Sequence, residues 1–161
     1  PRGRDKAAQR LTNDEIARAV LGYAPTQSGR AGHVALIMGN LRPVGGAGGS
    51  FRGSTSLTEA MAALLSKDEA CGSLVSLTLS IARMLGNDEC QAKLVFEEGG
   101  QRNIASYVSK YALTLASAGA EKSFDHDRPL STNSRQLVLN QEFLEPWRRY
   151  HRHLAKGPDA N

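Results

Sequence analysis

The stretch "LGNDECQAKLVFEEGGQRNIASYV", residues 85–108, decides the fold, because a double glycine divides two apolar segments within it. Gly86 is placed to end one helix, and the polar residues after it are good caps for the next. Leu94 supplies an apolar position in that next segment, and Gly99 and Gly100 follow it as a corner. We therefore predict a helix end, a new helix, a tight turn and a third helix.

Working outward, the flanking sequence carries further helix signals. "TNDEIARAVLG" and "SLTEAMAALLS" each open with a capping box, formed by Thr12 with Glu15 and by Ser56 with Glu59. Apolar residues at helical spacing and helix-ending signals predict helices over residues 70–86, 87–97, 101–119, 134–144 and 146–156, the last with Pro146 near its first position. Only "RQLVLNQ" alternates, and briefly, in the manner of a strand. The sequence thus predicts an all-α fold, a compact bundle of six to eight helices.

The predicted organisation is a single helical domain over residues 1–161. Within it, residues 43–56 hold five glycines and read as a Gly-rich loop or arm, because glycine loses much backbone entropy on ordering. Residues 119–134 read as a polar connection to the C-terminal helices.

Residues 74–116 resemble one armadillo-type repeat. The resemblance rests on Gly86-Asn87-Asp88, on Glu97-Glu98-Gly99-Gly100 and on the aliphatic spacing of Ile104 and Val108. It implies stacked helices and an adaptor that binds a protein or peptide in a helical groove. The chain holds one such repeat, whereas members of that family stack several.

Residues 11–52 resemble, more weakly, a helix-turn-helix followed by a Gly-rich wing. This resemblance implies a DNA-binding regulator with Arg30 at the start of the recognition helix and Arg52 in the wing. The turn "GYAPTQSG" is longer than the 3–4 residues usual for the motif.

The charges are unevenly distributed along the chain. Residues 1–52 hold eight basic and three acidic residues, residues 53–100 hold three and seven, and residues 101–161 hold nine and six. Near the C-terminus, "WRRYHRHLAKG" interleaves arginines with aromatic residues, a combination suited to phosphates and bases. The candidate nucleic-acid contacts are Arg2, Arg4, Lys6, Arg10, Arg30, Arg52, Arg148, Arg149 and Arg152.

Other classes of function have little support in the sequence. His151 and His153 would point to different sides of a helix, and we predict no catalytic residues, no metal site and no cofactor. No apolar run reaches the roughly 20 residues that span a bilayer, so no membrane partner is expected. Cys71 and Cys90 read as buried free thiols, which favours an intracellular, reducing compartment such as the cytoplasm or a nucleoprotein particle.

These observations predict a non-catalytic binding and assembly protein. It would pack against itself or other chains through helical faces, as a homo-oligomer or larger assembly, and would contact DNA or RNA through basic ends. A structural nucleoprotein or viral capsid protein has these properties. The alternatives are the armadillo-like adaptor and the winged-helix regulator.

Overall fold

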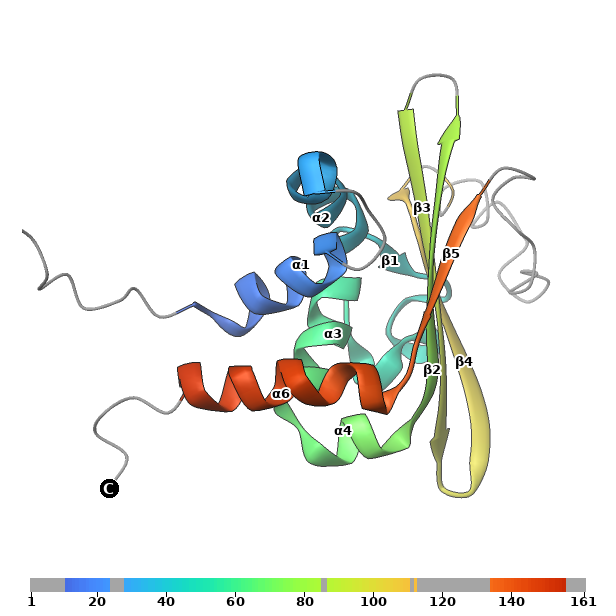
Figure 1. Cartoon of the computed structure of the whole chain (residues 1–161). Helices are drawn as coiled ribbons and strands as arrows, with labels where there is room; N and C mark the ends of the chain where they lie inside the picture. The colour runs from blue at the N-terminus through green and yellow to red at the C-terminus, as the bar shows by residue number, and fades with distance from the viewer. Residues whose placement is uncertain (1–10, 24–27, 85–86, 111, 113–133, 156–161) are drawn as a thin grey trace, which may run out of the picture.

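The computed structural model of the chain describes residues 11–23, 28–84, 87–110, 112 and 134–155. In this part of the chain, five α-helices lie on one face of a five-stranded antiparallel sheet (Figure 1). The fold is mixed α/β, so the predicted all-α bundle is wrong. The helices are α1 (Asn13–Tyr23), α2 (Ala31–Gly39), α3 (Leu57–Ser66), α4 (Asp68–Ser73) and α6 (Gln141–Ala155). The strands are β1 (Arg42–Pro43), β2 (Leu74–Met84), β3 (Asn87–Glu98), β4 (Gln101–Val108) and β5 (Arg135–Leu139).

Of the helices predicted over residues 70–86, 87–97 and 101–119, the first is wrong from residue 74 to 84, the second is wrong throughout, and the third is wrong for residues 101–108, because these segments are strands. In the predicted third helix, the described residues Lys110 and Ala112 are helical. Leu77, Leu79 and Ile81 alternate with three hydroxyl residues, and this period of two puts the apolar set on one face of a strand. Leu77 and Ile81 also fit a helical spacing, because positions four apart share a face in both patterns. Tertiary pairing between strands decides the outcome.

The double glycine forms a hairpin turn and not a corner between helices. Gly99 and Gly100 both have positive φ, 60° and 76°, and Glu98 pairs with Gln101 across the turn. Two successive residues with positive φ define the two-residue turn that matches the twist of paired strands. Glycine adopts this conformation without a steric cost.

The sheet has the order β1-β4-β3-β2-β5, and every neighbouring pair is antiparallel. Strands β2, β3 and β4 form a meander of two hairpins. The short β1 joins the outer side of β4, and β5 joins the outer side of β2, so β1 and β5 are the two edges. At the start of β2 the register shifts around Val75, which marks an irregularity in the pairing with β3.

The C-terminal helix begins earlier than predicted. The helix predicted over residues 134–144 is wrong for Arg135–Leu139, which is strand β5. Asn140 caps α6, because its side-chain Oδ1 accepts a hydrogen bond of 3.0 Å from the backbone N–H of Phe143. Pro146 therefore lies inside α6, five residues after its first residue, and not at the first helical turn.

The capping box predicted at Thr12 and Glu15 is confirmed, and the one at Ser56 and Glu59 is confirmed in part, because the Glu59 carboxylate accepts from the N–H of Thr55, at 2.7 Å, rather than from that of Ser56. The backbone N–H of Thr12 donates to Glu15 Oε2 at 2.7 Å, and the N–H of Glu15 donates to Thr12 Oγ1 at 3.2 Å. Ser56 Oγ accepts from the N–H of Glu59 at 3.3 Å. These contacts satisfy backbone donors that have no partner within the first turn of α1 and α3.

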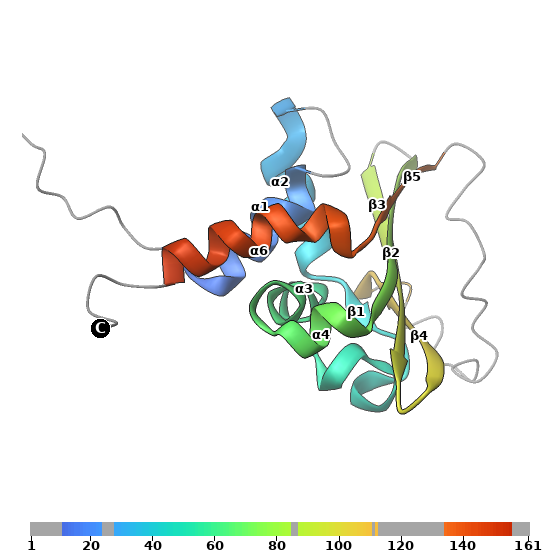
Figure 2. The same ribbon diagram turned by 60° about the horizontal axis from the view of Figure 1, so that its bottom comes forward.

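The hydrophobic core lies between the helices and one face of the sheet (Figure 2). Helix α3 is central: it contacts α1, α2, α4 and α6, and its inward residues are fully buried. The sheet contributes alternate residues of its three central strands, including Leu79, Ala92 and Tyr107, which lie side by side in register. The apolar faces of the helices are therefore used inside the molecule.

The Gly-rich segment predicted at 43–56 lies against strand β4. It contains Pro43, the second residue of β1, and two short 3-10 turns, Gly46–Gly49 and Phe51–Gly53. Phe51 is fully buried and meets Phe96 edge to face, with 5.0 Å between ring centres. The Tyr107 hydroxyl accepts from the Phe51 N–H at 2.9 Å and lies 2.6 Å from Ser54 Oγ. The predicted polar connection, 119–134, lies outside the described residues except for residue 134.

Replacing Tyr107 with phenylalanine is expected to destabilise the fold by about 1–3 kcal/mol, because it leaves the buried Phe51 N–H without its acceptor. Chemical denaturation followed by circular dichroism measures this. Tyr150→Phe is the matched control, since Tyr150 is 52% exposed, and its free energy of unfolding should not change. Equal stability of both variants would show that the Tyr107 hydroxyl does not hold the Gly-rich segment.

Candidate nucleic-acid interface

The predicted contacts at the start of the chain, Arg2, Arg4, Lys6 and Arg10, lie outside the described residues. The chain that carries them joins the described part at Leu11, directly before α1. By sequence, residues 1–10 hold these four basic residues and one acidic residue, Asp5. The position of α1 therefore fixes where this basic segment is attached.

Arg30 is engaged by a partner within the molecule. Its guanidinium pairs with Asp88, whose side chain is only 2% exposed, while His33 Nε2 lies 3.6 Å from the same carboxylate. A buried carboxylate without a cation or hydrogen-bond donor is costly, so Asp88 requires this contact. The contact joins the start of α2 to β3, and the role predicted for Arg30 in reading DNA has to compete with it.

Arg52 is held in a similar way. It is the one described residue other than glycine with positive φ, 51°, and its Nε donates to Glu98 at 3.0 Å. Its guanidinium also lies 5.8 Å from the ring centre of Phe51, over the ring face. These contacts fasten the Gly-rich segment to the end of β3.

Arg148 points into the molecule. Its side chain is 9% exposed and pairs with Asp68 of α4 and with Glu145 at 3.5 Å. The α6 face that contains Arg148 also contains Leu144 and His151, both buried. Arg148 thus joins α6 to α4, and the nucleic-acid contact predicted for Arg148 would have to compete with these two ion pairs.

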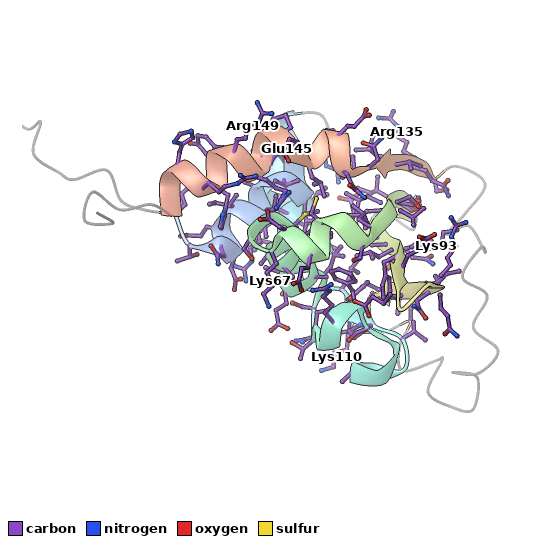
Figure 3. The ribbon with its side chains drawn as sticks, turned by 90° about the horizontal axis from the view of Figure 1, so that it is seen from below. Lys67, Lys93, Lys110, Arg135, Glu145 and Arg149 are labelled. Carbon is purple, nitrogen blue, oxygen red and sulfur yellow. The ribbon has the colours of Figure 1, made fainter. Side chains whose placement is uncertain are left out.

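Arg149 and Arg152 do lie on the exposed face of α6. Their side chains are 73% and 52% exposed, and both approach Glu145, at 3.3 and 3.6 Å. Figure 3 labels Arg149 and Glu145 on α6. Tyr150 is 52% exposed and His153 is exposed on the same half of the helix. This half of α6 therefore presents two guanidinium groups, an aromatic ring and an imidazole to solvent.

A hydrogen bond joins this part of α6 to the start of α1. His151 Nε2 and the side-chain oxygen of Asn13 are the partners. Figure 1 shows the first turn of α1 and the last turns of α6 on the same side of the molecule, away from the sheet. The start of α1, which residues 1–10 precede in sequence, is therefore joined to the C-terminal half of α6 through the buried face that contains His151. Asp14 and Glu15 at the start of α1 offset part of this positive charge.

Glu145 and Asp68, the two acidic residues that pair with the arginines of α6, are absent from the predicted site. Glu145 contacts three arginines, and its spacing of three and four residues from Arg148 and Arg149 is a readable signal on a helix. Asp68 is 80 residues from Arg148 in sequence, and no local pattern indicates that pair.

Both cysteines are buried and free, as the sequence predicts. Burial raises the pKa of the Cys90 thiol to about 12, and Asp88 and Glu89 add to that effect. Burial also raises the pKa of Cys71. The thiolate is the reactive form, so these environments suppress reaction with electrophiles near neutral pH.

In native protein at about pH 8, a pKa near 12 leaves about one Cys90 thiolate in ten thousand. We expect Ellman's reagent to titrate no thiol in the folded chain and both thiols after denaturation. Rapid reaction of either thiol under native conditions would contradict the buried positions.

Among the described residues, no group of three or more histidine, cysteine or acidic side chains is placed to hold a metal ion. None of the helices in that part of the chain has the length and apolar character needed to cross a membrane. Comparison with known proteins gives no matching family model, no matching curated protein and no matching solved structure.

Proposed function

We propose that this chain is a non-catalytic nucleic-acid-binding protein that works as part of an assembly. Its binding surface comprises the exposed half of α6 together with the basic segment that precedes α1. The observation that supports this proposal is the hydrogen bond between His151 and Asn13, which joins α6 to the start of α1, the helix that the basic residues 1–10 precede in sequence.

The chemistry of the exposed side chains suits this role. Guanidinium groups bind phosphate oxygens in pairs, and Tyr150 offers a flat face on which an unpaired base can stack. Arg149 and Arg152 both pair with Glu145, and these ion pairs are exposed to solvent. Exposed ion pairs contribute little free energy, so a phosphate can replace Glu145 as the partner of either arginine at small cost. We therefore expect single-stranded RNA or DNA to bind better than a duplex.

Fluorescence anisotropy with a labelled single strand tests the proposal. Binding should weaken steeply with salt, because each neutralised phosphate contributes about −0.7 to the slope of log K against log salt. Four to six contacts would give a slope of about −3 to −4. A chain that fails to bind single-stranded RNA and DNA even at low salt would refute the proposal.

The winged-helix alternative makes a different prediction. It requires Arg30 and Arg52 to reach DNA, whereas these residues contact Asp88 and Glu98 within the molecule. Under our proposal, reversing their charges lowers the stability of the fold and leaves the salt slope of binding unchanged. Loss of duplex binding with unchanged stability would favour the regulator.

A further inference from the structure

The two edges of the sheet differ in their capacity to accept another strand. Edge strand β1 has two residues, and one of them, Pro43, has no N–H to donate. The next residue, Val44, turns its N–H back to Ser106 of β4 at 2.9 Å. This edge is therefore too short to be extended by pairing.

Edge strand β5 has none of these protections. It contains five residues, with no proline, no bulge in its register with β2 and only Arg135 charged. Within the described part of the chain, no hydrogen bond uses the outward backbone groups of Arg135–Leu139. The part of β2 that β5 does not cover is protected, because Gln141 Nε2 donates a hydrogen bond of 2.7 Å to the backbone carbonyl of Leu74.

Val138 adds an apolar contact beside this open edge. It is 64% exposed, the largest exposure among the exposed large apolar residues of the described chain. Its register partner is Thr78, on the face of the sheet opposite the helices, while its neighbours Leu137 and Leu139 face the core. Open backbone groups next to an exposed valine are the features that promote pairing with another strand.

We infer that β5 pairs with β5 of a second copy, in antiparallel orientation, so that one sheet continues through both subunits. This inference rests on the proposed function and states which surface the chain uses to associate with its own copies. In this arrangement Val138 faces Val138 of the partner subunit across the two-fold axis. A pair formed by the same surface on both subunits closes on itself. Because β1 cannot be extended, the result is a dimer and not a filament.

The charge on β5 selects the antiparallel orientation. A parallel pair in register would place Arg135 beside Arg135 of the partner subunit, and like charges on paired strands repel each other. In the antiparallel pair centred on Val138, Arg135 lies at the far end of the strand from its copy, and Gln136 faces Asn140 of the partner subunit. Both polar residues can then stay hydrated at the rim.

Analytical ultracentrifugation of the nucleic-acid-free protein tests the inference. We expect a dimer for the wild-type chain and a dissociation constant raised at least about tenfold for Val138→Lys, which places two ammonium groups opposite each other. Ile104→Lys is the matched control, because Ile104 is a partly exposed residue of the same sheet face, on β4 away from the open edge. It should leave the dimer intact. Since no nucleic acid is present, failure here is distinct from failure of nucleic-acid binding.

Cross-linking gives a second readout that does not depend on a disruptive substitution. Paired antiparallel residues have Cα atoms about 4.5–5.5 Å apart, a separation that a disulfide can span. Val138→Cys should therefore form a covalent dimer on mild oxidation, and Ile104→Cys should not. A wild-type monomer at about 100 µM, or equal cross-linking of both variants, would overturn the inference.

Discussion

Replacing Arg149 and Arg152 with glutamate is expected to weaken binding of single-stranded nucleic acid at least about 25-fold at about 0.1 M salt. Each phosphate contact contributes about 0.7 to the salt slope, which corresponds to about fivefold in affinity at this concentration. The loss of two contacts therefore multiplies two fivefold decreases in affinity, and the new carboxylates also repel the phosphates. The salt slope itself should fall in magnitude by about 1.4.

The structure offers a matched control for this prediction. Arg149 is 73% exposed and lies 3.3 Å from Glu145, while Arg102 is 63% exposed and lies 3.4 Å from Glu97 on the sheet. Arg149→Glu and Arg102→Glu therefore change the net charge equally and break similar ion pairs. Only Arg149→Glu should lower the affinity at constant salt. Equal losses would mean that net charge alone attracts the nucleic acid.

Shortening Leu94 to alanine is expected to lower the free energy of unfolding by about 2–5 kcal/mol. Leu94 is fully buried at the centre of β3, in register with Leu77 on one side and Ala105 on the other. Its removal leaves a cavity between the sheet and the helices that the rigid strands cannot close. Denaturant unfolding, followed by circular dichroism, measures the change.

Ile104 supplies the comparison that separates a sheet from the predicted helices. A helix over residues 101–119 would align Ile104 with the apolar face that includes Val108, so truncation there would be costly. In the sheet Ile104 is 43% exposed, and Ile104→Ala should cost about 1 kcal/mol or less. A large loss at Ile104 with a small loss at Leu94 would contradict the strand register.

Local signals in the sequence predict the helical half of the fold and misjudge the sheet. The capping residues Thr12 and Ser56 identify the starts of α1 and α3, because a cap acts within three residues of its helix. The strands depend on pairing across the chain, as when β5 joins β2 more than fifty residues earlier. In such segments apolar spacing alone is ambiguous, and the period-two alternation of 76–81 is the better signal.

The turn at Gly99 and Gly100 shows why one wrong interpretation leads to wrong predictions for the segments on both sides of it. A double glycine is compatible with a helix end and with a hairpin, and the two interpretations assign opposite structures to both flanking segments. The alternation of Ala92, Leu94 and Phe96 before the turn favours the hairpin.

The candidate site was predictable only in part. The C-terminal arginines stand out by composition, and the spacing of Glu145 from Arg149 is readable on a helix. The inward position of Arg148 depends on Asp68, and the engagement of Arg30 depends on Asp88, 58 residues away. Contacts over such separations follow from the fold and have no local signature.

Amide hydrogen exchange with and without a bound single strand tests the central claim most directly. The account predicts added protection in residues 149–153 of α6 and in the residues around Leu11 and Asn13, with the strands unchanged. Protection confined to the sheet face around Lys93, or no change in α6 despite saturating nucleic acid, would contradict it.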